Sequence, residues 1–202
     1  MPLHCSFRSL IIVFLPRWVR VNTLKLSLQS FLQNLSSKSF IEVGDLAALE
    51  ETRNGYLIDL HVPDLLPFNR LYPVTTTFSR EYSTGQIILQ DKASCIPASL
   101  LDVQTGDIVL DACAAPGNKT TQLAAGVGTE GHVFAIERDE KRAVVLRDMV
   151  KKAGAEKCIP TEGISFLRSL FSTFARISVS RYLYLPQSFY FCVVALLLLT
   201  VM

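Results

Sequence analysis

The spacing of hydrophobic positions changes within the first forty residues. Between Trp18 and Leu24 polar and apolar side chains alternate, which is the period of a half-buried strand. From residue 26 to residue 35 the apolar positions are 28, 31, 32 and 35, a spacing typical of one helix face. Residues 17–35 therefore predict a small unit in which a helix follows a strand.

From residue 81 onwards the pattern predicts a longer series of elements. Residues 86–90 have the composition of a short strand, and a helix follows that Pro97 is expected to break. The series continues with a strand at 107–110, a helix at 119–125, a strand at 132–137, a helix at 139–153 and a strand at 157–161. Strands and helices that alternate at this spacing predict parallel strands joined by right-handed crossovers, which is an α/β architecture.

The predicted helix at 139–153 has one apolar face. Its apolar stripe consists of Ala143, Leu146, Val150 and Ala153. The basic residues Lys141, Arg142, Lys151 and Lys152 lie off that stripe. We therefore expect this helix to pack on the core through the stripe.

The two ends of the chain leave alternatives open. Residues 10–15 form a short apolar run, but no small-residue cleavage site follows, so a signal peptide is not favoured. Residues 182–202 are uncharged and long enough to span a bilayer. Pro186 interrupts them and leaves 14 uniformly apolar residues, 189–202, which favours a buried or interfacial segment over a membrane span.

Composition excludes some classes of protein. Twenty Lys and Arg are nearly balanced by 18 Asp and Glu, so charge gives no argument for a nucleic-acid partner. The five cysteines are scattered and odd in number, which indicates free thiols in a reducing compartment. The three histidines lie far apart and predict no metal site.

Two motif matches are set aside because of their context. Residues 126–131 satisfy G-x-G-x-x-G, but they follow a predicted helix and precede a strand, the reverse of a dinucleotide-binding turn. We expect them to form a connector. Residues 117–120 (GNKT) resemble a phosphate-binding P-loop, but Asn118 stands directly before Lys119, where that motif requires glycine.

The strongest candidate site follows the strand at 107–110. Small residues at 112, 114 and 115 would let a ligand approach the backbone, and Pro116 and Gly117 would form a tight turn before a helix. Glu137 ends the next strand, where an acid accepts hydrogen bonds from ribose hydroxyls. The alternative is that Glu137 pairs on the surface with Arg138 or Arg142. Together, turn and acid predict a nucleoside ligand.

Three segments carry a resemblance to a known family. DACAAPGNKT (111–120) resembles the first motif of the NSUN (Sun-domain) RNA cytosine carbon-5 methyltransferases, in the form with Asn before Lys found in the large-subunit rRNA branch. PRWVRVNTLK (16–25) is similar to a strand of that family's small RNA-binding subdomain, and LQDKASCIPA (89–98) to the segment leading into its methyltransferase domain. The resemblance runs from about residue 16 to residue 162.

The resemblance implies a Rossmann-like S-adenosylmethionine-dependent methyltransferase fold, here incomplete, with a small N-terminal α+β RNA-binding-like subdomain. It implies S-adenosyl-L-methionine as cofactor, RNA of the rRNA class as partner, and the nucleus or nucleolus as location, with a cytoplasmic or membrane-associated location left open. The residues implied to wrap the methionine end are Cys113, Ala114, Ala115, Pro116, Gly117, Asn118 and Lys119. Glu137 would hold the ribose, Arg142 would support that pocket, and Asp111 would fix the loop from below.

The chain departs from the family pattern in its catalytic residues. The family's cysteines stand in Pro-Cys-Ser or Thr-Cys-Ser contexts, which this chain lacks, so no catalytic residue is assigned. Ser165 stands where the family has an acid near the adenine. From about residue 163 the resemblance stops, and we expect a truncated or alternatively read product that is inactive alone. The alternative is a non-enzymatic truncated or membrane-tethered fragment.

These observations predict four segments. Residues 1–15 are unassigned, 16–80 form the N-terminal subdomain, 81–163 form the cofactor-binding half of the methyltransferase domain, and 164–202 form a divergent apolar tail.

Overall fold

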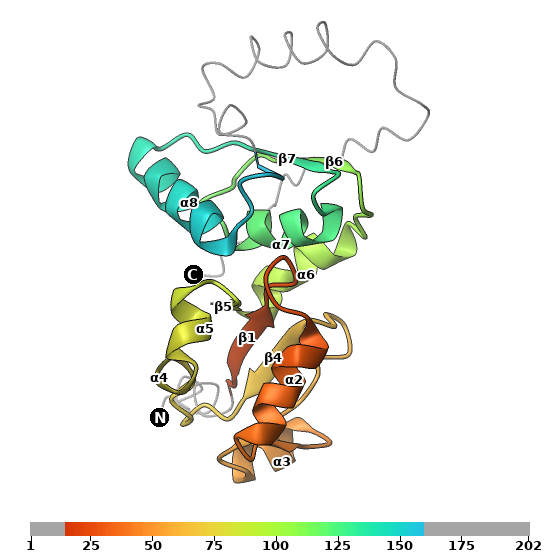
Figure 1. Cartoon of the computed structure of the whole chain (residues 1–202), viewed down its shortest axis with the longest axis vertical. Coiled ribbons are helices and arrows are strands. Elements are labelled where there is room, and N and C mark those ends of the chain that lie inside the picture. The colour runs from red at the N-terminus through yellow and green to blue at the C-terminus, as the bar shows by residue number, and fades with distance from the viewer. Residues whose placement is uncertain (1–14, 160–202) are drawn as a thin grey trace, which may run out of the picture. The chain divides into compact units, whose positions relative to one another are not determined.

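The computed structural model describes residues 15–159 (Figure 1). The chain divides into two compact units between Lys92 and Ala93, and each unit is described by itself. The predicted tail at 164–202, Ser165, Cys5 and Cys192 lie outside the described residues.

The first unit contains a five-stranded sheet of order β2-β3-β4-β1-β5. The strands are β1 (Arg17–Val21), β2 (Ile41–Glu42), β3 (Gly55–Tyr56), β4 (Leu65–Phe68) and β5 (Ile87–Leu89). The helices are α2 (Leu28–Ser37), α3 (Leu46–Glu51), α4 (Val74–Thr77) and α5 (Ser79–Ser83). Strand β1 pairs antiparallel with both β4 and β5.

The predicted strand and helix at 17–35 are both present. Val19 and Val21 of β1 are fully buried in one core with Phe31 and Leu35 of α2. The strand ends at Val21, earlier than the alternation suggests, because the side chain of Asn22 accepts a hydrogen bond from the backbone of residue 24 and turns the chain. Ser27 caps α2 by accepting a hydrogen bond from the backbone of residue 30.

The opposite face of β1 carries a buried charge. The side chain of Arg20 is fully buried, and its Nε donates a hydrogen bond of 2.8 Å to Oε1 of Gln90, just beyond β5. Residues 86–90 are expected to lie in the second domain, 81–163. The predicted strand is present, but its backbone pairs with β1, so it belongs to the first unit.

The second unit is built from alternating helices and strands. Its elements are α6 (Lys92–Leu100), β6 (Ile108–Asp111), α7 (Asn118–Val127), β7 (His132–Ala135) and α8 (Glu140–Ala153). Strands β6 and β7 pair in parallel over four residues, from Ile108 opposite His132 to Asp111 opposite Ala135. The predicted α/β architecture with parallel strands is confirmed.

Residues 157–159 are the described part of the predicted strand at 157–161. They are not in a strand, but the backbone N–H of Val133 donates a hydrogen bond of 2.8 Å to the carbonyl of Cys158. The chain therefore returns alongside β7 after α8.

The predicted break at Pro97 is wrong, because α6 continues through it. Proline removes one backbone donor from a helix interior. Packing outweighs this loss, since Cys95 and Ala98 on either side of Pro97 are buried.

The apolar stripe of α8 is confirmed, since Ala143, Leu146, Val150 and Ala153 are its buried residues. Residues 128–131 form the connector between α7 and β7, whereas Gly126 and Val127 of the predicted connector are the last residues of α7. A Cβ atom on Gly131 would lie 2.6 Å from the carbonyl oxygen of Asp107, so this connector passes too close to the neighbouring backbone for a larger residue.

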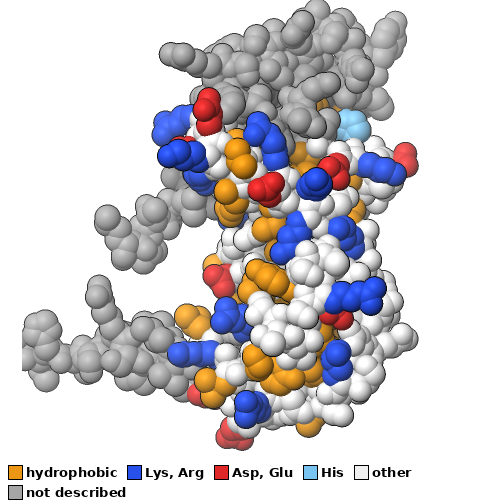
Figure 2. All heavy atoms as spheres, turned by 60° about the vertical axis from the view of Figure 1, so that its left-hand side comes forward, with side chains coloured by type: hydrophobic (Ala, Val, Ile, Leu, Met, Phe, Trp, Pro, Cys, Tyr) orange, Lys and Arg blue, Asp and Glu red, His pale blue; other side chains and the backbone are white. Residues whose placement is uncertain are grey.

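The described surface agrees with the balanced composition. Figure 2 shows Lys and Arg side chains interspersed with Asp and Glu on one face rather than gathered into a continuous stripe. Within residues 15–159 no helix is long and apolar enough to cross a membrane.

Candidate functional site

The loop at 112–117 follows Asp111, the last residue of β6. This side chain is 2 % exposed. Its Oδ1 accepts a hydrogen bond of 3.2 Å from the backbone N–H of Cys113, and its Oδ2 accepts one of 2.7 Å from the hydroxyl of Thr120. Asp111 thus ties both the loop and the first turn of α7 to the end of the strand.

The environment of Asp111 shifts its proton affinity. Burial raises the pKa of this carboxyl above its ordinary value of 3.8, and the nearby charge of Glu137 acts in the same direction. Hydrogen bonds from Thr120 and Cys113 and the charge of Lys119 oppose the rise in pKa.

Backbone pairing brings Glu137 beside the loop. Beyond the end of the sheet, the N–H of Ile136 donates to the carbonyl of Asp111 (2.8 Å), and the N–H of Ala114 donates to the carbonyl of Ile136 (3.0 Å). These two bonds extend the pairing of β6 with β7 into the loop. Because Glu137 directly follows Ile136, it lies beside the start of the 112–117 loop.

The two carboxylate oxygens of Glu137 have different surroundings. The residue is 5 % exposed, and Oε1 accepts a hydrogen bond of 3.0 Å from the backbone N–H of Asp139. Within the described part of the chain Oε2 accepts no hydrogen bond, and Nη2 of Arg142 lies 3.6 Å from it. The alternative of a surface pair with Arg142 is therefore only half correct, because the arginine is exposed and the carboxylate is buried.

Arg142 contacts the loop directly. Its Nη2 donates a hydrogen bond of 2.7 Å to the carbonyl of Ala115. Since the same nitrogen lies near Glu137, one guanidinium group joins the loop to the acid at the end of β7. The structure thus brings together the three parts that sequence analysis singles out, namely the loop, Glu137 and Arg142.

The turn at the end of the loop depends on Gly117. Ala114 and Ala115 are buried, whereas Cys113 and Pro116 are exposed. Gly117 has φ +111°, and a Cβ atom there would lie 3.0 Å from Cγ of Met149 in α8. Only glycine combines this backbone conformation with so close a contact.

Helix α7 starts at Asn118, and its first residues form hydrogen bonds both within the helix and to α6. The carbonyl of Asn118 accepts a hydrogen bond from the hydroxyl of Thr121 (3.1 Å). The ammonium group of Lys119 donates one of 2.9 Å to the hydroxyl of Ser94 in α6. Gln122 reinforces the contact between α6 and α7 by donating to the hydroxyl of Ser99 (3.0 Å).

Sequence reasoning missed Thr120 and Ser94. Thr120 directly follows Lys119 in the motif, but no periodicity links its hydroxyl to Asp111. Ser94 lies 25 positions before Lys119, and no local pattern pairs residues at that separation.

Residues 15–159 contain no group of three His, Cys, Asp or Glu side chains that could hold a metal ion.

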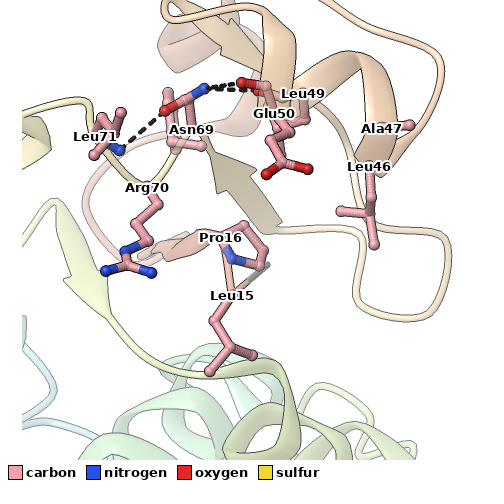
Figure 3. A pocket seen from close by; sticks show the side chains of 10 residues that line it. Leu15, Pro16, Leu46, Ala47, Leu49, Glu50, Asn69, Arg70 and Leu71 are labelled. Carbon is pink, nitrogen blue, oxygen red and sulfur yellow. Dashed lines mark hydrogen bonds between the residues drawn. The ribbon is translucent and has the colours of Figure 1, made fainter. Parts of the chain in front are cut away.

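A pocket of ≈ 560 Å³ lies beside α3 in the first unit, which contains neither the loop nor Glu137 (Figure 3). It is lined by Leu15, Pro16, Leu46, Ala47, Leu49, Glu50, Phe68, Asn69, Arg70 and Leu71. None of the predicted site residues lines it.

Two family models match the chain. The model described as 16S rRNA methyltransferase RsmB/F matches residues 98–178. The model described as NOL1/NOP2/Sun domain family member 5, ferredoxin-like domain, matches residues 15–90.

Curated relatives are similar over the same part of the chain. The 28S rRNA (cytosine-C(5))-methyltransferase of Mus musculus is 40% identical over 149 residues, which are 71% of this chain and 31% of the relative. The 25S rRNA (cytosine-C(5))-methyltransferase rcm1 of Schizosaccharomyces pombe is 41% identical over 145 residues, 71% of this chain and 30% of the relative. The chain thus spans less than a third of the length of these two relatives.

Solved structures agree on the fold. A methyltransferase homolog protein from Pyrococcus horikoshii is 32% identical, with a TM-score of 0.57 over 70% of this chain and 41% of its own. The NSun6 protein of the same organism, at 15% identity, shares the fold with a TM-score of 0.56 over 77% of this chain and 59% of its own. The resemblance of residues 111–120 is therefore confirmed, and the chain belongs to the NOL1/NOP2/Sun-domain methyltransferase family, with an N-terminal ferredoxin-like domain and a Rossmann-like methyltransferase fold.

Proposed function

We propose that the second unit is the cofactor-binding half of an S-adenosyl-L-methionine-dependent rRNA cytosine-5 methyltransferase. The observation that carries the proposal is the buried carboxylate of Glu137, held beside the 112–117 loop by the backbone pairing at Ile136. An acid at the end of the second strand, next to a turn at the end of the first, is the arrangement by which such sheets bind a nucleoside.

The residues present fit this cofactor. Ribose hydroxyls are hydrogen-bond donors, and Oε2 of Glu137 accepts no hydrogen bond within residues 15–159. Cys113 and Pro116 of the loop are exposed, and the first N–H groups of a helix such as α7 lack partners within the helix. We assign the methionine end to the loop and first turn of α7, from Cys113 to Lys119, and the ribose to Glu137.

Arg142 supports the site rather than binding the ligand. Its hydrogen bond to the carbonyl of Ala115 fixes the loop, and its charge faces Glu137 without occupying Oε2 through a hydrogen bond. Asp111 fixes the other end of the loop through the N–H of Cys113. Two side chains from separate elements therefore keep the loop in a shape that can receive the ligand.

The chemistry of methyl transfer sets a further requirement. When bound, S-adenosylmethionine supplies an electrophilic methyl group. Carbon 5 of cytosine is a poor nucleophile, and the family activates it by adding a cysteine thiolate to carbon 6. The described cysteines do not meet this requirement by motif or environment. Cys95 is fully buried, burial raises the pKa of Cys158, and Cys113 belongs to the loop.

We therefore propose that this chain binds the cofactor without catalysing transfer alone. RNA of the rRNA class is proposed as partner, since the relatives carry rRNA methyltransferase names and the first unit has a ferredoxin-like domain. A nucleolar location is part of the same proposal.

Titration calorimetry of the whole chain with S-adenosylhomocysteine tests the proposal. We expect the wild-type chain to bind and Glu137→Ala to weaken binding at least about tenfold, because a buried hydrogen-bond acceptor for the ribose is lost. Glu130→Ala removes an exposed acid from the connector after α7 and should bind like the wild type. Absence of binding by the wild-type chain would favour the alternative, a non-enzymatic fragment.

A further inference from the structure

We infer that Thr120 is a positioning residue that sets the shape of the 112–117 loop through its hydroxyl group. The inference rests on the proposed function, because the loop is the part assigned to the methionine end of the cofactor. Thr120 touches no ligand in this assignment and acts through Asp111 and Ala114.

The hydroxyl of Thr120 lies between two acceptors. The residue is fully buried in the first turn of α7. Its Oγ1 lies 2.7 Å from Oδ2 of Asp111 and 3.0 Å from the carbonyl oxygen of Ala114. The contact with Asp111 joins the helix to the end of β6, and the contact with Ala114 joins the helix to the loop.

A hydroxyl group has one proton, so it cannot donate fully to both acceptors at once. The contact with the carboxyl oxygen of Asp111 is the shorter of the two, so this oxygen takes the larger share of the proton. The carbonyl of Ala114 accepts the weaker share of the same proton in a three-centre hydrogen bond, and the N–H of Ala114 donates to the carbonyl of Ile136. Both ends of the Ala114 residue are thus placed by neighbours, one in β6 and α7 and the other beyond β7.

Loss of the hydroxyl would reach the loop through Asp111. The carboxylate would keep its bond from the N–H of Cys113 but lose the donor on its other oxygen. A buried oxygen without a donor is costly, and the side chain can recover only by turning toward solvent. Such a turn would release Cys113, the first residue of the proposed methionine-end contacts.

The test compares variants that differ in the hydroxyl alone. Thr120→Val keeps the shape and removes the hydroxyl, whereas Thr120→Ser keeps it. Thr120→Ser and Thr120→Ala are a second pair should the valine variant fail to fold, which thermal melting reports. Thr121→Val is the matched control, because Thr121 is also buried in α7 but donates to the carbonyl of Asn118 within the helix.

Two measurements are made on the whole chain. Calorimetry with S-adenosylhomocysteine should show binding about 10- to 100-fold weaker for Thr120→Val or Thr120→Ala, and within about threefold of wild type for Thr120→Ser and Thr121→Val. Amide hydrogen exchange, followed by NMR, should be at least about tenfold faster at Cys113 in the two variants without the hydroxyl.

Equal binding and equal Cys113 exchange in the valine and serine variants would overturn the inference. Equal loss in Thr120→Ser and Thr120→Ala would also overturn it, because the methyl group rather than the hydroxyl would then matter. A wild-type chain that does not bind S-adenosylhomocysteine contradicts the proposed function alone, since the exchange of Cys113 still decides the role of Thr120.

Discussion

Arg142, on the first turn of α8, donates a hydrogen bond of 2.7 Å to the carbonyl of Ala115, 27 positions earlier in the chain. The bond holds the loop after β6 against the helix that follows β7. The same Nη2 lies 3.6 Å from Glu137, so the guanidinium group stands between the loop and the acid.

Replacement of Arg142 should weaken ligand binding more than it weakens folding. We expect Arg142→Ala to reduce the affinity for S-adenosylhomocysteine by about 5- to 20-fold, because the loss of one charged hydrogen bond frees the loop. Its side chain is 59% exposed, so the free energy of unfolding should change by less than about 1 kcal/mol. Calorimetry and urea denaturation measure the two effects. Lys141→Ala, an exposed change on the same helix, is the control, and equal affinities in the two variants would refute the role given to Arg142.

Gly117→Ala should destabilise the second unit. The φ of +111° is unfavourable for alanine by about 1–3 kcal/mol, and the added Cβ would also meet Met149 at 3.0 Å. Gly106→Ala isolates the backbone effect, since φ is +92° there but no atom lies within 4 Å of the added Cβ. Denaturation midpoints should fall further for Gly117→Ala than for Gly106→Ala. A smaller fall at position 117 would mean that the contact with α8 relaxes without cost.

Lys92→Met should lower stability at neutral pH but not at low pH. Burial by itself would raise the pKa of Asp59, but a 2.6 Å hydrogen bond from the Lys92 ammonium and two backbone N–H bonds hold that pKa below its ordinary value of 3.8. A carboxyl whose pKa is lowered in the folded state stabilises it above the ordinary pKa, and this stabilisation is lost as the pH falls through the lowered value.

The variant should therefore be less stable than wild type by about 1–3 kcal/mol near pH 7, the value for a hydrogen bond between charged groups. Urea denaturation at several pH values should show this difference shrinking below pH 3.8. Lys25→Met is the control, since this lysine donates a hydrogen bond to the backbone carbonyl of Thr84. A difference that does not depend on pH would count against the ion pair as its source.

Cys113 should react with thiol reagents at a rate that depends on the cofactor. It is exposed in the loop, whereas Cys95 and Cys158 are buried. Maleimide labelling followed by peptide mass spectrometry should modify Cys113 several-fold faster than these two. Saturating S-adenosylhomocysteine should slow its labelling in the wild-type chain but not in Glu137→Ala. Unchanged labelling of Cys113 at saturation would place the ligand elsewhere.

The alternating part of the chain could be predicted because each element there is long enough to have a period. Helix α8 shows this best, since its four stripe residues are the buried ones. Glu137 could be placed because the order of strand, turn and strand brings the ends of parallel strands together.

Other features had no local signal, or had one that the assembled unit overrides. Strands β2 and β3 have two residues each, too few for any period, and they exist through pairing with neighbours distant in sequence. Pro97 predicts a break that burial of its neighbours overrides. The hydrogen bonds of Thr120 to Asp111 and of Lys119 to Ser94 depend on side-chain positions that only the assembled unit defines.

The buried guanidinium of Arg20 also bears on how the first unit avoids wrong arrangements. Successive residues of β1 point to opposite faces, so sliding this strand by one position would carry Arg20 into the aromatic core around Phe31 and push Val19 out of it. A charge among phenylalanine rings would have no acceptor comparable to Gln90. Arg20 therefore favours the native register of β1, because a strand shifted by one residue would bury its charge among apolar side chains.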